Sequence, residues 1–493
     1  MTPAIRRIGL VGCALLVGFA IVLVRGEPIV LGDQGVFLSI AARMLDGDHL
    51  YSGVVDNKDP LFFYTYAGAL WVGGWRAPFA LDGIWLAIAG MSFALLLREL
   101  RAPRPAVVAG FFMYPLALTI GWYEPGLSML GGLAFAPLVG WLWLRGRFAA
   151  SGAALGVVML FKLSVVLVAA GPVAAFIFLG APGGSRVRQL AKGAAGVVTV
   201  VGAAAAVLAV RGELRAYLDV LVYDFYYTDE GLVGRGKSSG IAGHLGVVRE
   251  FLGGLQTVAA VVVLGVFLVA VYVGRTRQGR AFQLVAAAAI TTLIATLTTL
   301  ALTAIWPHHL QMLAYPVVLV AAALITVTRS YHGQRAGMVA AGVCVLFLVL
   351  STAKDEVRHG VPAARWFSAP QTATAAALET ARMRFYGRLD RVTYMHLGQN
   401  SENAHAVFLN DGFALTCPRF HQYPHDPGKQ LRDVLDCVKK ANPMLILVTP
   451  SLFDLPGATA QWDTFVSGAQ HLLESRYDMI SKAGGVEVWK RTR

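Results

Sequence analysis

Residues Gly32 to Pro60 read GDQGVFLSIAARMLDGDHLYSGVVDNKDP, and this polar stretch lies between two strongly apolar segments. It holds five aspartates, one lysine and one histidine. An apolar run from Ile8 to Val24 precedes it, and another begins at Leu61. Charged residues held between apolar runs indicate a loop at a membrane surface that the neighbouring helices position.

The composition supports a membrane protein. Of 493 residues, 56% are apolar and 14% are charged, and the mean hydropathy is +0.59. These values favour a polytopic membrane protein over a water-soluble enzyme. The 42 Lys and Arg exceed the 29 Asp and Glu by 13, an excess typical of cytoplasmic loops and anionic-lipid contacts rather than of nucleic-acid binding. No small-residue cleavage site follows the first apolar run, which predicts an uncleaved signal anchor.

The apolar runs predict the helices that cross the membrane, since about 20 apolar residues span a bilayer core of about 30 Å. The clear candidates are residues 8–25, 80–97, 105–121, 125–144, 193–210, 252–273, 282–303, 309–328 and 336–351. The run from 149 to 180 is too long for one crossing and is interrupted by FKLS, so we expect two short helices that meet near Lys162. With this pair the chain has about 11 helices.

Basic clusters orient these helices, because connections rich in Lys and Arg stay in the cytoplasm. The clusters are Arg6 and Arg7; Arg98, Arg101 and Arg104; Arg145 and Arg147; Arg186, Arg188 and Lys192; Arg275, Arg277 and Arg280; Arg329 and Arg335. They place the N-terminus inside and Gly32–Pro60 outside. The short run from Leu61 to Trp75 is then a helix in the outer interface rather than a span, because the sides must alternate.

The predicted organisation is a transmembrane module, residues 1–351, followed by a small extracytoplasmic α/β domain, residues 352–493. The module carries outside loops 26–79 and 211–251. In the domain, VTYMHLG, AHAVFL, MLILVTP and VEVWKR predict strands, and residues 428–440 and 460–475 predict helices. Cys417 and Cys437 lie in this part and could form a disulfide if it is outside the cytoplasm.

Asp33 is the first candidate for chemistry. An amphipathic helix on the outer leaflet is predicted after it from the spacing of the apolar residues, namely Val36, Phe37, Ile40, Ala41, Met44 and Leu45. Asp33 then stands at the helix start, where an aspartate caps free N–H groups. A carboxylate at the membrane surface could also act as the general base toward an acceptor hydroxyl. The two interpretations are compatible.

Two lysines are candidate cations for a lipid phosphate. Lys58 lies between Asp56 and Asp59, and it either snorkels in a surface ion pair or stabilises a phosphate oxyanion at headgroup depth. Lys162 lies inside a long apolar run, where a lysine needs a counter-charge or a water-filled site. A functional site is the default interpretation of Lys162, with a structural ion pair as the alternative.

The remaining candidates fall on the same predicted side. Glu124, in WYEP, either starts a helix or is a second carboxylate of the cavity; Asp59 and His309 are grouped with it as a second acidic or acceptor site. Arg235 and Lys237 either add positive charge or belong to a solvated loop, and His308 either contacts phosphate or anchors a span. The sequence shows no P-loop, dinucleotide fingerprint, nucleophile elbow or metal-ligand spacing.

Three motifs together carry a family resemblance. The first loop, with GDQGVFLSIAARMLDGDHLY and DNKDPLFFYTYA, resembles the GT-C glycosyltransferases that use polyprenyl-phosphate sugars. Protein O-mannosyltransferases and the lipid A aminoarabinose transferase are the most similar members. YEP looks like the second acidic site of that family, and GVVMLFKLS looks like its lysine-containing broken helix. The likeness covers roughly residues 8–350, and the tail matches nothing known to us.

The resemblance implies a role for each matching residue. Asp33 would be the catalytic carboxylate and Lys58 the donor-phosphate lysine, with Lys162 and Arg235 as further cations and Glu124 as the second acid. It implies inversion at the anomeric carbon, with polyprenyl phosphate departing unprotonated. Some GT-C enzymes bind a divalent metal and others do not, so metal dependence is left open. Asp33 and Glu124 would be the ligands of such a metal.

The preferred hypothesis is therefore a multi-pass glycosyltransferase of a bacterial inner membrane with an extracytoplasmic active site. Its expected partners are a polyprenyl-phosphate-linked sugar, a glycan, lipid or protein acceptor, and membrane lipid, but no nucleic acid. One alternative is a lipid or sugar transporter, although no matched pair of interrupted helices occurs in two repeated halves. Another is a non-catalytic membrane scaffold whose C-terminal domain binds polysaccharide.

Overall fold

The structure is a computed structural model. It describes residues 3–25, 33–74, 77–119, 128–179, 185–230, 280–301, 311–359, 392–398, 414–419, 422, 428–448, 460–483 and 486–492. The predicted span at 252–273 and the predicted strand AHAVFL lie outside these residues.

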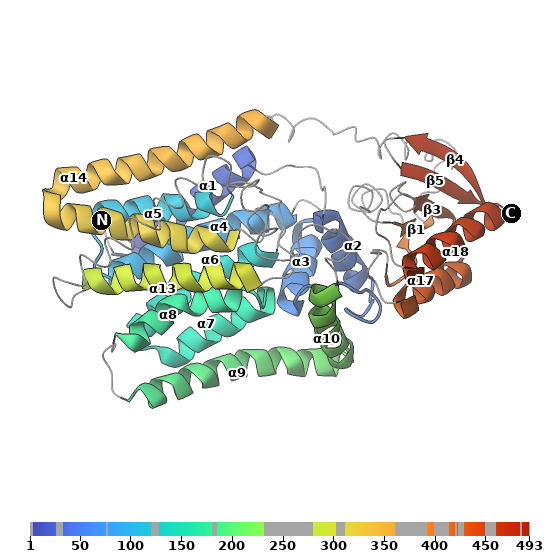
Figure 1. Ribbon diagram of the computed structural model, residues 1–493, viewed down its shortest axis with the longest axis horizontal. Coiled ribbons are helices and arrows are strands. Elements are labelled where there is room, and N and C mark those ends of the chain that lie inside the picture. Colours follow the sequence, from blue (N-terminus) through green and yellow to red (C-terminus); the bar gives the residue numbers. More distant parts are fainter. Residues whose placement is uncertain are drawn as a thin grey trace.

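Long helices run side by side and form one bundle (Figure 1). They are α1 (Pro3–Arg25), α4 (Ala77–Glu99), α5 (Arg104–Ala117), α6 (Ser128–Leu144), α7 (Phe148–Phe161), α8 (Val165–Phe178), α9 (Arg186–Val210), α13 (Arg280–Ala301) and α14 (Ala314–His359). Within the described residues, three segments are long and apolar enough to cross a membrane, namely Ala80–Glu99, Arg186–Val210 and Gln311–Arg329. Several shorter apolar helices accompany them.

Two breaks in the helices occur where the sequence predicts them. Helix α7 ends at Phe161 and α8 begins at Val165, because Lys162 adopts an extended conformation with φ −163° and ψ 110°. Helix α14 contains a non-helical residue, Gly333, with φ 84°. Its two arms meet there at the end of the bundle far from the C-terminal strands (Figure 1). The separate helices predicted at 309–328 and 336–351 are therefore confirmed.

Helices α7 and α9 approach each other through small residues. A Cβ atom added at Gly152 would lie 1.8 Å from the Gly193 carbonyl oxygen, and one added at Gly196 would lie 2.0 Å from that of Ala149. Only glycine fits at such distances, and small residues at a helix contact are the usual means of close packing in membranes. This contact fixes the start of α9, and α9 in turn carries α10.

Three helices lie across the end of the bundle that faces the C-terminal strands (Figure 1). They are α2 (Asp33–Leu45), α3 (Pro60–Gly73) and α10 (Leu214–Glu230). The helices predicted after Asp33 and over residues 61–75 are thus confirmed. The predicted surroundings of the first were wrong, because Phe37, Ile40 and Ala41 are buried in protein rather than turned to lipid. Phe37 packs edge-on against Phe62 of α3, with ring centroids 4.8 Å apart.

The C-terminal residues form a five-stranded sheet with the strand order β2-β1-β3-β5-β4. The strands are β1 (Thr393–Leu397), β2 (Ala414–Leu415), β3 (Leu445–Val448), β4 (Tyr477–Ala483) and β5 (Val486–Arg491). β1 runs parallel to β2 and β3, whereas β5 is antiparallel to β3 and β4. Helix α17 (Gly428–Ala441) packs against α18 (Ala460–Arg476), and the two match the helices predicted at 428–440 and 460–475. We call these strands and helices the C-terminal unit.

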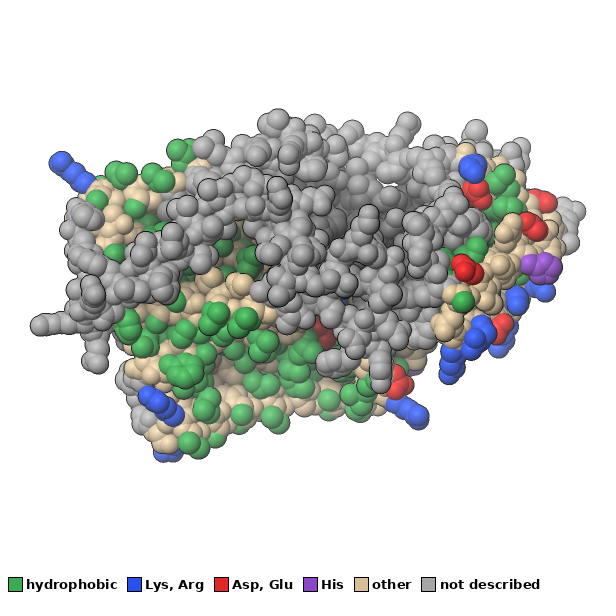
Figure 2. Space-filling view, viewed as in Figure 1, with side chains coloured by type: hydrophobic (Ala, Val, Ile, Leu, Met, Phe, Trp, Pro, Cys, Tyr) green, Lys and Arg blue, Asp and Glu red, His purple; other side chains and the backbone are tan. Residues whose placement is uncertain are grey.

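Apolar and charged side chains are separated on the surface. On the face shown in Figure 2, hydrophobic side chains gather over the described helices of the bundle, and charged side chains gather over the C-terminal unit. An apolar belt with charged ends is the surface that a bilayer requires. The helices that lie across the bundle end, α2, α3 and α10, therefore occupy the boundary between the apolar belt and the charged unit.

Candidate active site

Lys58 lies against the first turns of α2. Its Nζ atom is 5.6 Å from the centroid of the Phe37 ring, in cation–π geometry, and its side chain is 15% exposed. Phe37 stands four residues after position 33, so the two positions share one face of α2. Asp56 Oδ1 is 3.9 Å from the ammonium. The charge of Lys58 is therefore partly balanced by Asp56, and the lysine packs near the start of α2, where Asp33 stands.

Asp59 is a buried carboxylate that joins three segments. The Tyr217 hydroxyl of α10 donates to Oδ1 at 2.9 Å, and the Leu163 N–H in the break between α7 and α8 donates to Oδ2 at 3.0 Å. Asp59 is 6% exposed. Burial raises the pKa of its carboxyl above the ordinary value, and the positive charge of Lys162 opposes that rise more than any other group.

Asp59 thus provides the counter-charge that was predicted for Lys162. Its extended backbone ends α7, and its N–H still donates to the Val158 carbonyl at 3.0 Å. The following turn offers the Leu163 N–H to Asp59. The break in the helix therefore gives the buried carboxylate of Asp59 both the positive charge of Lys162 and a hydrogen bond from the Leu163 N–H.

Tyr51 links the turn that carries Lys58 to helix α10. It adopts a left-handed conformation with φ 68°, which costs a bulky residue about 1 kcal/mol or more. Its hydroxyl donates to the Lys58 carbonyl at 2.8 Å, and its ring lies 5.0 Å from that of Tyr217. Burial, and next the negative charge of Asp59, raise the pKa of the Tyr51 phenol. This strained tyrosine holds the turn that presents Lys58.

Glu213 is the anchor between α9 and α10 that sequence reasoning missed. Its side chain is fully buried and accepts hydrogen bonds from the Leu50 N–H at 3.0 Å, from Arg211 Nε at 2.9 Å and from the Tyr64 hydroxyl. Tyr217, the partner of Asp59, lies one helical turn further along α10. Glu213 therefore fixes α10 to the loop on the same face that carries Tyr217. The only sequence signal for it is a carboxylate directly after an apolar span.

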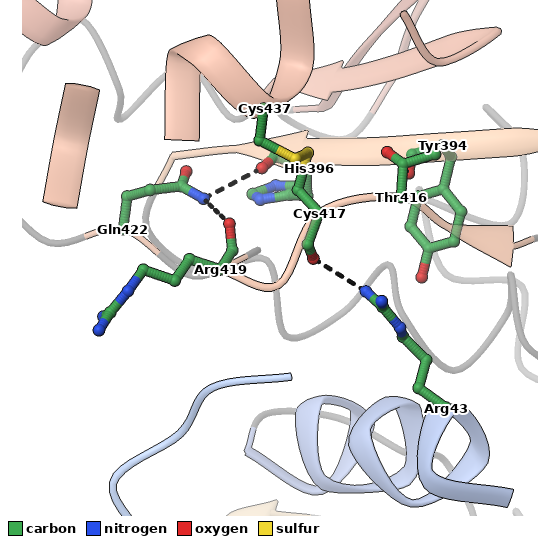
Figure 3. Close-up of a disulfide and its surroundings, with 8 residues drawn as sticks. All are labelled: Arg43, Tyr394, His396, Thr416, Cys417, Arg419, Gln422 and Cys437. Carbon is green, nitrogen blue, oxygen red and sulfur yellow. Dashed lines mark hydrogen bonds between the residues drawn. A yellow bond between two sulfur atoms is a disulfide. The ribbon is translucent and has the colours of Figure 1, made fainter. Parts of the chain in front are cut away.

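The C-terminal unit contacts the loop directly. Arg43 Nη1 donates to the Cys417 carbonyl at 3.0 Å, and the Val55 N–H donates to the Pro418 carbonyl at 3.1 Å. Cys417 and Cys437 form a disulfide, which attaches this segment to α17. Figure 3 shows Arg43 reaching from α2 to the segment that the disulfide holds. The loop is thus fastened to the bundle through Asp59 and to the C-terminal unit through Arg43 and Val55.

The side chains of the other predicted site residues lie outside the part of the chain that the structure describes. Glu124, Arg235, His308 and His309 lie outside the described residues, as does the side chain of Asp33. Of the predicted set, the structure brings together Lys58, Asp59 and Lys162. Among the residues that the structure describes, no group of three or more His, Cys, Asp or Glu side chains gathers as metal ligands would.

Comparisons with known proteins found similarity in structure only. No family model matches the chain, and no curated protein matches its sequence. ArnT from Cupriavidus metallidurans bound to undecaprenyl phosphate aligns with a TM-score of 0.51 at 16% identity, over 99% of this chain and 98% of its own. The arabinofuranosyltransferase AftD from Mycobacteria aligns with a TM-score of 0.54 at 14% identity; it covers the whole of this chain, which spans 40% of AftD.

These alignments run over the bundle and the C-terminal unit together, because each covers essentially the entire chain. The apo form of ArnT gives a TM-score of 0.50 at 14% identity. At such identities the likeness establishes the fold and nothing finer. The chain is a multi-pass membrane protein with the GT-C glycosyltransferase fold.

Proposed function

We propose that the protein transfers a sugar from a polyprenyl-phosphate donor to an acceptor hydroxyl, with inversion at the anomeric carbon. The observation that carries this proposal is the position of Lys58, whose ammonium lies over the ring of Phe37, and Phe37 stands one helical turn after position 33 on α2. In this proposal the base and the phosphate cation act at the same end of α2. The GT-C fold, shared with an ArnT structure that holds undecaprenyl phosphate, supports the donor class.

In the proposed reaction Asp33 accepts the acceptor proton as the hydroxyl oxygen attacks the anomeric carbon. The new bond joins that oxygen to the anomeric carbon, and the bond from the carbon to the phosphate oxygen breaks. The electron pair leaves with polyprenyl phosphate, which needs no protonation. The Lys58 ammonium stabilises the departing phosphate, and its 15% exposure keeps the site from being fully screened by water.

Asp59 has a positioning role in this proposal. Both of its oxygens already accept hydrogen bonds, and only 6% of the residue is exposed. The acceptor contact predicted for it from the sequence is therefore disfavoured. Glu124, Arg235, His308 and His309 stay as predicted cavity residues, and a divalent metal held by Asp33 and Glu124 stays open.

We place the active site and the C-terminal unit outside the cytoplasm of a bacterial cell, at the inner membrane. The Cys417–Cys437 disulfide supports this orientation, because such bonds persist in oxidising compartments. The division into a module of residues 1–351 and a domain of residues 352–493 belongs to the same proposal. The sugar and the acceptor are left open among glycan, lipid and protein.

The function is tested by turnover. Purified protein in lipid nanodiscs is incubated with a panel of polyprenyl-phosphate-linked hexoses and pentoses, and released polyprenyl phosphate is measured by mass spectrometry. We expect time-dependent release from at least one donor, by transfer or by slow hydrolysis. No release from any donor by folded protein, together with movement of an intact donor across the membrane when the protein is reconstituted into closed vesicles, would instead identify a transporter.

Replacement of Lys58 by alanine is expected to weaken use of the donor. A hydrogen bond to a charged group contributes about 1.5–3 kcal/mol, so kcat/KM for the donor should fall by about 10- to 100-fold. Lys58→Arg should recover part of this loss because it keeps the charge. Lys440→Ala, an exposed lysine of α17, is the matched control. Unchanged donor kinetics in Lys58→Ala would refute the phosphate contact.

Cysteine labelling tests the orientation. In a Cys13→Ala, Cys344→Ala background, Ser467→Cys on α18 is expected to react with a membrane-impermeant maleimide in intact spheroplasts. Ser185→Cys, at the start of α9, should react only after the membrane is opened. Both serines are exposed, so the two variants differ chiefly in the side of the membrane on which the cysteine is expected. The reverse pattern of labelling would place the C-terminal unit in the cytoplasm.

A further inference from the structure

A second site is formed where α10 meets the C-terminal unit. A cleft of about 200 Å³ opens there. It is lined by Tyr51, Ala216, Asp219, Val220, Arg419 and Gln430. Four of these side chains are polar and differ in kind: a phenol, a carboxylate, a guanidinium and an amide. Neither the phosphate chemistry of Lys58 nor the general base uses this cleft.

Two walls of the cleft are covalently linked. Arg419 lies two residues after Cys417, and Gln430 lies seven residues, or two helical turns, before Cys437 on the same face of α17. The disulfide therefore ties the segment that carries Arg419 to the helix that carries Gln430. Figure 3 shows the Arg419 side chain extending away from the disulfide. The walls are held in place without a ligand, as in a preorganised site.

The third wall is shared with the candidate active site. Tyr51 lines the cleft, while its hydroxyl donates to the Lys58 carbonyl at 2.8 Å and its ring packs on Tyr217. Asp219 and Tyr217 are two residues apart on α10, so the helix that holds Asp59 also borders the cleft. A molecule bound in the cleft would therefore lie next to the turn that presents Lys58.

The chemistry of the lining selects a class of ligand. Carboxylate, guanidinium and amide groups offer several donors and acceptors each, in planar arrangements that match neighbouring hydroxyl groups. The Gln430 oxygen Oε1 is buried and accepts no hydrogen bond from the described residues, so turning this amide toward a ligand hydroxyl would break no hydrogen bond to its oxygen. Among the described residues that line the cleft, only Ala216 and Val220 are purely aliphatic. A lipid tail would find little to pack against.

We propose that this cleft binds a carbohydrate part of the acceptor, through Asp219, Arg419 and Gln430, beside the donor site. The inference rests on the proposed function, because it names the class of acceptor for that reaction. The residues of the cleft take no part in bond formation. They hold the sugar unit whose hydroxyl, or whose neighbour along the glycan, is delivered to Asp33.

Binding of short oligosaccharides tests the cleft. Full-length protein in nanodiscs is titrated separately with mannotriose, arabinotriose and maltotriose, with saturation-transfer NMR as the readout. We expect at least one trisaccharide to bind the wild type. Arg419→Ala and Gln430→Ala should each raise its Kd by about tenfold, the equivalent of about 1.4 kcal/mol. Arg432→Ala and Gln470→Ala, exposed on α17 and α18, are matched controls that should leave Kd unchanged.

Two results would overturn the inference. The first is that no trisaccharide binds, or that one binds equally to all variants with their disulfide and thermal unfolding intact. The second is that a serine- and threonine-rich peptide binds in an Arg419-dependent manner while the sugars do not, which would assign the cleft to a protein acceptor. Release of polyprenyl phosphate by the wild type is measured in the same preparation. If that release fails while Arg419-dependent sugar binding persists, the transferase proposal fails and carbohydrate recognition survives it.

Discussion

Asp33→Asn is expected to lower sugar transfer by about 10²- to 10⁴-fold, the usual contribution of a general base. Asparagine keeps the size of the side chain and can still cap the start of α2, but it cannot accept the proton of the attacking hydroxyl. The loss should therefore appear in kcat with little change in donor affinity or thermal unfolding. Initial rates at saturating donor, compared with the wild type, give the measurement.

Asp46→Asn is the matched control for this variant. Asp46 lies in the same loop and is exposed. It should retain the wild-type rate. Equal activity of folded Asp33→Asn and wild type would show that another group accepts the proton. An equal loss in both variants would show that the loop tolerates no change of charge, and the specific assignment of Asp33 would fall.

Asp59→Ala is expected to have the largest effect on stability. The carboxylate itself is costly to bury, but its removal leaves the Tyr217 hydroxyl and the Leu163 N–H without their acceptor and Lys162 without its counter-charge. Removing one partner of a buried charged pair costs about 3–5 kcal/mol. Thermal unfolding in detergent should report the loss. Asp46→Ala, which removes an exposed aspartate from the same loop, should unfold like the wild type.

The pKa of Asp59 adds a dependence on pH. Because burial raises this pKa above 3.8, the folded state binds a proton that the unfolded state releases between 3.8 and the raised value. Stability contributed by Asp59 therefore falls as pH rises through that window and is constant above it. Asp59→Asn should lose this slope, since an amide does not titrate there. An identical slope in the variant and the wild type would assign the titration to another group.

Much of the bundle could be predicted because lipid imposes a simple rule on the chain. Apolar runs of sufficient length become helices, and a lysine within such a run signals either a break or a partner. Lys162 satisfied both expectations, with a break at Phe161 and Asp59 beside it. The strands VTYMHLG, MLILVTP and VEVWKR were also predicted correctly, since each is a short apolar or alternating run bounded by turn residues.

The tertiary partners of the loop could not be predicted, because each depends on segments far apart in the sequence. Glu213 accepts a hydrogen bond from the N–H of Leu50, 163 positions away, and Arg43 donates to the carbonyl of Cys417, 374 positions away. The spacing of apolar residues predicts helices and strands but not which distant residues pair. The apolar face of α2 likewise fits either lipid or protein from its spacing alone. The packing of Phe37 on Phe62 decided for protein.

The most direct test of the central claim is an experimental structure of the wild-type protein in nanodiscs with polyprenyl phosphate bound. We expect the phosphate within charge-assisted hydrogen-bond distance of Lys58 Nζ, about 2.7–2.9 Å, and next to the first turn of α2. A phosphate bound elsewhere, with Lys58 still packed on Phe37 and far from it, would contradict the assignment of this loop as the donor site.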